Sequence, residues 1–356
     1  PVPAATALRG YGGGSLVLDG TSAGVSISRN LSLQGQGPIS DRGAALVSVG
    51  DNTLSGAVSM GVPSLGTGVP PRLTSATGML TLSGSLDSDT VVAIGSTGSI
   101  VNVLGGAANQ AGVGSYNLTG ALTGDSVLEN TGTGSLILNP SSSAGFSGSI
   151  RVSSSAASGQ SSVRITSPGV LGTRTSTTTS SVLDVNAGIL EVRMDTPSLL
   201  AGGSAANVYG RNSSTFFVDH SIGGSAINGT ATFGAFAIEE TETYPFNSRN
   251  GYGVTFAATP VQGGGDDNAF TNNLGGTLTF TGAFWSNTED SASHLMTIGG
   301  NGNTLISGNV TASSASFDHR LTKTGSGLLT ISSTGSTLDG AVSVQGSLQI
   351  TDFRSI

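Results

Sequence analysis

The sequence contains no cysteine, which excludes disulfide bonds and thiolate metal sites as sources of stability. Only 10% of its 356 residues are charged, and lysine and arginine together number 13. Phosphate binding depends on clustered basic side chains, so nucleic acid is not predicted as a partner. The net charge of −8 also disfavours attachment to an anionic membrane surface.

Long apolar and helical segments are missing as well. No apolar run approaches the roughly 18 residues that a membrane-spanning helix needs, so no membrane span is predicted. Glycine or a run of serine and threonine interrupts every candidate amphipathic helix before three turns are complete. The chain begins at Pro1 without a charged-then-apolar segment, so we expect an exported chain to be in its mature form.

Glycine (56 residues) and short apolar clusters are abundant instead. In clusters such as Leu16–Leu18, Leu80–Leu82 and Leu278–Phe280, apolar residues alternate with polar ones or follow one another directly. Glycine, serine or asparagine bounds the clusters. Such clusters are typical of strands between turns and argue against disorder, which dilutes apolar residues evenly. The sequence therefore predicts an all-β fold.

Internal repetition indicates how these strands are arranged. Residues 321–350 contain two glycine-bounded strand motifs, and residues 132–152 repeat the same order of glycines and apolar pairs. One short strand cannot bury its apolar face alone, but rungs of about 20 to 25 residues that coil and stack can. We predict a β-solenoid (parallel β-helix) with irregular loops. A β-sandwich array is the competing architecture, and it would require longer strands and more aromatic residues.

The motif at Leu321–Ile331, followed by that at Gly340–Ile350, resembles the autotransporter-associated β-strand repeat of bacterial surface proteins. The resemblance is good for this unit, fair for about three others and weak over the middle third of the chain. That family usually has an aromatic residue and Gly-Gly-Thr before the closing strand, where this chain has Leu338 and Gly340-Ala341. The resemblance implies a packing role for these positions, and no catalytic residue is carried over from it.

Aromatic residues concentrate in one segment, which divides the chain into residues 1–208 (solenoid), 209–273 (an aromatic-rich insertion or broadened rungs) and 274–356 (C-terminal solenoid rungs). One interpretation gives the segment a small core of its own. The other makes it a surface that binds a glycan, a surface ligand or a host partner. The predicted partner-binding residues are Phe216, Phe217, Tyr244, Phe246 and Tyr252.

Candidate catalytic groups are few. Asp219-His220 and Asp318-His319 place an acid beside an imidazole, but neighbours on a strand point to opposite faces. Asp266-Asp267-Asn268 could offer oxygen ligands to Ca²⁺, yet it lacks the spacing of calcium-binding solenoids and is interpreted as a turn. We therefore predict no enzyme, no catalytic residue, no metal site and no cofactor.

The leading functional prediction is an extracellular structural protein of a bacterial cell surface that assembles with copies of itself into a fibre or layer. A solenoid end exposes unpaired strands, and the predicted assembly residues are Leu348, Ile350 and Phe353. The alternative is an adhesin or autotransporter passenger that binds through the aromatic segment. A second alternative is a β-helix polysaccharide lyase or hydrolase, which would need grouped carboxylates.

Overall fold

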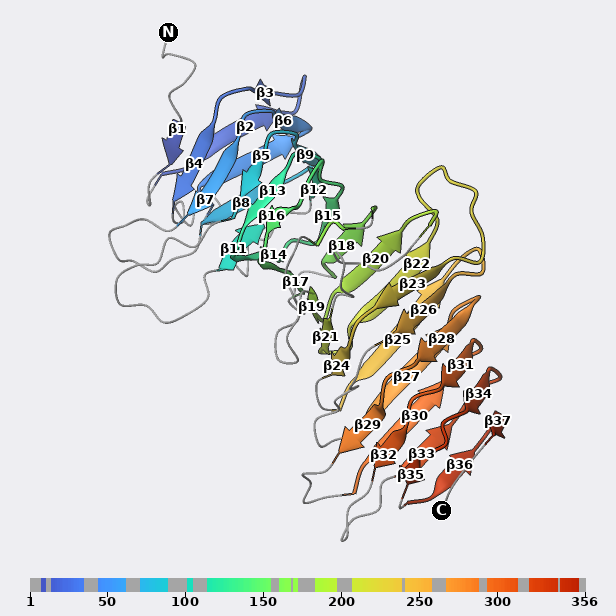
Figure 1. Cartoon of the computed structure of the whole chain (residues 1–356). Helices are drawn as coiled ribbons and strands as arrows, with labels where there is room; N and C mark the ends of the chain where they lie inside the picture. The colour runs from blue at the N-terminus through green and yellow to red at the C-terminus, as the bar shows by residue number, and fades with distance from the viewer. Residues whose placement is uncertain are drawn as a thin grey trace. The chain divides into compact units, whose positions relative to one another are not determined.

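The described residues contain β-strands and no helix. This confirms the prediction of an all-β fold. The computed structural model divides into two compact units, residues 1–174 and 175–356 (Figure 1). It describes residues 8–10, 14–34, 44–61, 71–88, 101–104, 114–154, 160–167, 169–171, 183–196, 207–238, 241–257, 267–287, 293–312, 320–338 and 340–351.

The described strands of unit 1 lie in three sheets, with six of these strands in each. Sheet 1a consists of β1 (Leu8–Gly10), β4 (Leu31–Gln34), β7 (Val58–Gly61), β10 (Leu86–Asp87), β13 (Leu122–Gly124) and β16 (Gly145–Phe146). Sheet 1b consists of β2 (Leu16–Gly20), β5 (Leu46–Gly50), β8 (Arg72–Ser75), β11 (Val101–Leu104), β14 (Val127–Asn130) and β17 (Ser149–Ser153). Sheet 1c consists of β3 (Ser26–Ile27), β6 (Asn52–Leu54), β9 (Met79–Leu82), β12 (Ser115–Leu118), β15 (Ser135–Leu138) and β18 (Ser162–Ile165).

The described strands of unit 2 lie in four sheets. Sheet 2a consists of β19 (Leu183–Asn186), β21 (Val208–Arg211) and β24 (Phe236–Ile238), and sheet 2d of β29 (Phe284–Asn287), β32 (Val310–Ala312) and β35 (Thr337–Leu338). Sheet 2b consists of β20 (Ile189–Arg193), β22 (Thr215–Asp219), β25 (Thr243–Ser248), β27 (Asn268–Asn273), β30 (Leu295–Gly299), β33 (Arg320–Lys323) and β36 (Val342–Val344). Sheet 2c consists of β23 (Thr230–Phe233), β26 (Gly253–Phe256), β28 (Thr277–Phe280), β31 (Asn303–Ile306), β34 (Leu328–Ile331) and β37 (Ser347–Ile350).

The described strands of each unit pair in parallel with strands from the rungs before and after, so both units are β-solenoids, as predicted. Rung length varies more than predicted. Leu118 and Leu138 are partners 20 residues apart, whereas Leu82 and Leu118 are partners 36 residues apart. The number of residues between paired strands accounts for the difference, since the described strands themselves stay two to six residues long.

The interior of each unit is built from columns of apolar residues in register. In unit 1, such a column runs through sheet 1c along Leu54, Leu82, Leu118, Leu138 and Ile165, all buried. Every second residue of a strand points to the same face, so stacking in register joins these side chains into one core. The alternation of apolar residues in the sequence therefore becomes a continuous interior.

The aromatic segment contributes rungs to unit 2 and does not form a separate insertion. Its described strands join sheets that also hold strands outside it, as where β27 pairs with β30. Phe233, Phe256 and Phe280 occupy successive rungs of one column, with ring centroids 5.5 Å apart at each step. Stacked rings at this spacing contribute packing beyond the area they bury. The aromatic residues thus form the core of this part of the solenoid.

Candidate functional site

Four of the five predicted partner-binding aromatics lie in the core. Phe216, Tyr244, Phe246 and Tyr252 are buried among neighbouring rungs, and Phe216 and Phe246 are stacked with ring centroids 4.7 Å apart. A partner could not reach these rings without opening the rungs. The binding-surface interpretation is therefore wrong for these four residues. Their rings lie in a core, as the other interpretation expected, but it is the core of the solenoid and not a separate core of the segment.

Phe217 is the one member of the set that faces outward. It is partly exposed on the outer face of β22, between the buried Phe216 and Val218. Two guanidinium groups lie near its ring, with the Cζ atom of Arg193 at 4.6 Å from the ring centroid and that of Arg249 at 6.0 Å. Cation–π attraction holds both arginines against this outer face.

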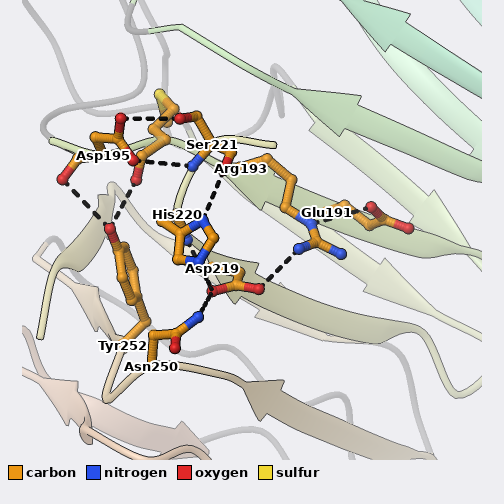
Figure 2. Close-up of polar contacts among 9 residues, drawn as sticks. Glu191, Arg193, Asp195, Asp219, His220, Ser221, Asn250 and Tyr252 are labelled. Atoms are coloured by element: carbon orange, nitrogen blue, oxygen red, sulfur yellow. Dashed lines mark hydrogen bonds and ion pairs between the residues drawn. The ribbon is translucent and has the colours of Figure 1, made fainter. Parts of the chain in front are cut away.

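Asp219, the last residue of β22, is the centre of the polar cluster next to Phe217 (Figure 2). Its Oδ2 atom accepts a hydrogen bond from Arg193 Nη1 at 2.8 Å, and Oδ1 accepts from Asn250 Nδ2 at 2.6 Å and from the backbone N–H of His220 at 2.9 Å. Glu191 lies on the other side of Arg193, with Oε2 at 3.6 Å from Nε. One buried carboxylate therefore joins β20, the end of β22 and the turn after β25.

The environment of Asp219 favours its charged form. Burial by itself would raise the pKa of this carboxyl group, but the hydrogen bonds from the Asn250 side chain and the His220 backbone, with the charges of Arg193 and His220, lower the pKa below its ordinary value. A carboxylate with a lowered pKa is a weak proton acceptor. Asp219 is consequently suited to holding positive groups in place and not to general-base catalysis.

His220 lies on the same side as Asp219, contrary to the alternation expected for strand neighbours. Because β22 ends at Asp219, His220 is outside the strand, and its Nε2 atom lies 4.0 Å from Asp219 Oδ1. Its Nδ1 atom is 2.6 Å from the carbonyl oxygen of Ser221. A carbonyl only accepts, so Nδ1 carries the hydrogen and Nε2 faces the carboxylate. Both ring nitrogens are thus directed at the protein.

The loop after His220 is anchored at both ends. Ser221 Oγ donates to Asp195 Oδ2 at 2.8 Å, and the backbone N–H of Asn228 donates to the carbonyl oxygen of Asn250 at 2.8 Å. Between these anchors, Ile222 and Ile227 are 75% and 67% exposed. The loop therefore presents two apolar side chains to solvent beside the cluster.

Tyr252 supports the same region from within. Its hydroxyl donates to the carbonyl oxygens of Met194 at 3.0 Å and Asp195 at 3.3 Å, as Figure 2 shows. Burial, and then the negative charges of Asp195 and Asp219, raise the pKa of this phenol. Tyr252 therefore stays protonated and acts as a hydrogen-bond donor that fixes the end of β20.

Sequence reasoning missed Arg193, Arg249 and Asn250. Arg193 could have been found from the sequence, because strand residues Leu190–Arg193 are in register with Phe216–Asp219, which places Arg193 opposite Asp219. Recognising this pair would have required knowing that paired residues of these two strands are 26 positions apart. The other two residues lie in a turn whose position relative to Asp219 depends on the longer rung between Phe216 and Phe246.

Two of the predicted assembly residues, Leu348 and Ile350, lie on β37, which is an edge strand of sheet 2c among the described strands. On β37, Ile350 is 36% exposed and Leu348 is partly buried, while Val344 on β36 is 45% exposed. Phe353 lies outside the described residues. The assembly role of these residues stays a prediction.

The predicted turn at Asp266-Asp267-Asn268 is described only from Asp267, and Asn268 is the first residue of strand β27. Asp267 Oδ1 accepts from the backbone N–H of Leu295 and Asn268 Oδ1 from that of Glu242, each across one rung. Asp318-His319 and Asp266 are not described. Within the described ranges, no group of three or more acidic or histidine residues is placed to hold a metal ion, and no helix could cross a membrane.

Comparison with protein-family models, curated proteins and solved structures finds no match to this chain. The resemblance of Leu321–Ile350 to the autotransporter-associated repeat accordingly stays a prediction.

Proposed function

We propose that this chain is an extracellular structural protein of a bacterial cell surface, with its solenoid rungs as a scaffold. The observation that carries the proposal is the use of its carboxylates. Eight of them bond to a side chain or backbone N–H about one rung away: Asp51, Asp87, Glu129, Asp184, Asp195, Asp219, Glu242 and Asp267.

These contacts tie consecutive rungs together. Arg211 holds Asp184 with two bonds, Nε to Oδ1 at 3.0 Å and Nη2 to Oδ2 at 2.7 Å, and Thr123 donates to Asp87 directly opposite it. Bidentate arginine–carboxylate pairs are geometrically specific and stronger than single hydrogen bonds. A chain with few charges that places them between rungs is suited to resisting separation of those rungs.

Buried asparagines continue the same connections inside the corners. Asn52 Nδ2 donates to the carbonyl oxygen of Leu18, and Oδ1 accepts from the backbone N–H of Val25, both in the preceding rung. Asn272 Nδ2 donates to the carbonyl oxygen of Asn303 in the following rung. Buried polar networks whose members are satisfied rigidify a structure. Stiffness along the stack is what a surface scaffold requires.

Deleting one whole rung tests the scaffold proposal. Because Leu118 and Leu138 are register partners, removing residues 119–138 leaves the remaining strands in phase, whereas removing residues 119–128 does not. In cells that produce the protein, we expect antibodies to label intact cells and the whole-rung deletion to retain the surface structure that gene deletion removes. Loss of that structure with the whole-rung deletion, or labelling only after permeabilisation, would contradict the proposal.

We further propose that copies associate through strand edges. The support is that β36 and β37 have described partners on one side only, and that Val344 and Ile350 expose apolar surface there. Sedimentation at increasing concentration should show association that the double change Val344→Lys and Ile350→Lys weakens. The control is Thr277→Lys, which alters an exposed residue of β28, a strand with described partners on both sides. A wild-type chain that stays monomeric at every concentration would overturn this part of the proposal.

A further inference from the structure

Arg249 carries a positive charge that no described carboxylate neutralises. The backbone N–H of Arg249 donates to the carbonyl oxygen of Val218, which places Arg249 next to Asp219. The carboxylate oxygens of Asp219, however, accept hydrogen bonds from Arg193, Asn250 and His220. Arg193, Asp219 and Arg249 therefore alternate in charge over three rungs. Arg193 contacts both Asp219 and Glu191, so Arg249 is the cation of this group without a contacting carboxylate among the described residues. Arg249 is exposed and touches the Phe217 ring, which orients its guanidinium group at the surface.

A track of side chains runs beside this column on the outer face of sheet 2b. Phe217 is in register with Asn247, and Asn247 with Asn273, on three successive strands. Parallel strands lie about 4.8 Å apart, so the track repeats at that interval along the stack. Asn273 Nδ2 lies 3.5 Å from Asn247 Oδ1, and both side chains reach solvent. The track thus offers an apolar ring followed by amide donors and acceptors.

The neighbouring loop adds apolar surface in a fixed position. Ile222 follows Ser221, which is bound to Asp195, and Ile227 precedes Asn228, which is bound to Asn250. The cluster therefore combines an exposed cation, an aromatic ring, amides and apolar side chains.

We propose that this surface binds an unbranched acidic polysaccharide, with a uronate carboxylate on Arg249 and neighbouring sugars along Asn247 and Asn273. A guanidinium group binds a carboxylate through two parallel hydrogen bonds. Amide side chains bond sugar hydroxyl groups, while the Phe217 ring, over which Arg193 and Arg249 lie, holds the guanidinium group of Arg249 in position. A regular track suits a repeating polymer better than an acidic peptide, whose side chains vary. The proposal does not depend on the scaffold function.

Binding is measured with the purified full chain and three acidic probes: polygalacturonate, alginate and hyaluronate. We expect at least one to bind with an affinity that falls as salt rises, and methyl-esterified polygalacturonate to bind less well than polygalacturonate if that is the probe. Arg249→Gln should weaken binding by about tenfold, because it removes a charge-assisted contact. Asn247→Asp should weaken it as well by repelling the polymer.

The matched control is Arg320→Gln, which removes an exposed arginine from β33 of the same sheet. It should leave binding within about twofold of the wild-type value. Failure of all three probes to bind would overturn the proposal, as would equal losses in Arg249→Gln and Arg320→Gln. Poly-L-glutamate binding as tightly as the best polysaccharide would assign the surface to acidic peptides instead and would also overturn it.

Discussion

Arg193 and Asp219 face each other directly across the paired strands β20 and β22, with Nη1 of the arginine 2.8 Å from Oδ2 of the aspartate. The aspartate is nearly inaccessible and the arginine only partly exposed, so solvent screens the pair weakly. Asp219 also accepts hydrogen bonds from the Asn250 side chain and the backbone N–H of His220. This one carboxylate therefore holds in place the chain that leaves β22.

Replacing Asp219 should therefore destabilise unit 2. Asp219→Ala removes three acceptor contacts and leaves Arg193 with Glu191 as its remaining acidic neighbour, so we expect the free energy of unfolding to fall by about 2 to 3 kcal/mol. Urea unfolding followed by circular dichroism measures the change. The control is Asp19→Ala, since Asp19 is exposed and its hydrogen bonds with described residues are to Thr21 in its own turn. Equal losses in the two variants would show that Asp219 has no special role.

The Asp219 carboxylate should also make the free energy of unfolding decrease at acid pH. Its pKa is lowered in the folded protein, so the folded state binds this proton less tightly than the unfolded state. Its contribution is fully present above the unfolded value of about 3.9 and is lost as pH falls through the folded pKa. Below about pH 4, wild type should lose stability more steeply than Asp219→Asn. Identical acid limbs for both proteins would contradict the assignment.

The aromatic residues give a comparison between core and surface. Phe246 is buried against Phe216, Phe236 and Phe256, so Phe246→Ala should cost about 3 to 5 kcal/mol. Phe217 lies on the outer face with Arg193 and Arg249, so Phe217→Ala should cost about 1 kcal/mol. Thermal and urea unfolding of the two variants tests the order. A larger loss for Phe217→Ala would place the core on the other face of β22.

Strand identity was predictable because the side-chain period is a local property. Leu136 and Leu138 alternate with polar or outward-facing residues, and both are buried in the structure. Register was not predictable, since it depends on how many residues each loop takes between paired strands. Leu82 and Leu118 are partners across 36 residues, but Leu118 and Leu138 across only 20. No fixed repeat length could have aligned all three.

The polar cluster escaped prediction for the same reason. Asp219 and His220 were expected to point apart, and the rule failed because β22 ends between them. Phe217 shares its strand face with Asp219. A charged residue on that face is a signal in the sequence that the face is the outer one. Phe216 shares its face with Val218, which indicated the core. Parity within one strand could thus have separated the two rings, whereas Arg249 and Asn250 needed the register of the next rung.

Two glycines separate the effect of backbone strain from that of close packing. Gly325 and Gly223 both have positive φ, 72° and 81°, which costs a residue with a Cβ atom about 1 to 2 kcal/mol. A Cβ atom on Gly325 would lie 2.3 Å from the carbonyl oxygen of Gly300, whereas one on Gly223 would meet nothing within 4 Å. Gly325→Ala should therefore cost about 1 to 3 kcal/mol more than Gly223→Ala. Similar unfolding midpoints for the two variants would contradict the close stacking of turns at Gly300 and Gly325.

Lys323, the only lysine in the sequence, interrupts an apolar column of unit 2. It stands in register between Ile298 and Val344, and its buried ammonium group donates to the carbonyl oxygens of Thr324 and Gly325. Burial lowers the pKa of this amine in the folded protein. Over the interval between the folded pKa and the unfolded value of about 10.4, the unfolded chain holds more protons, so stability rises with pH.

Lys323→Met should abolish that alkaline rise. The substitution keeps an unbranched side chain of similar length in the column and removes the buried charge, so the unfolding free energy near pH 7 should be maintained or increased. Urea unfolding at steps between pH 7 and 10.5 gives the two profiles. Tyrosines titrate in both proteins, and subtracting one profile from the other isolates the lysine. If both profiles have the same alkaline slope, the amine is not buried as a charged group, and the column is open to solvent at this rung.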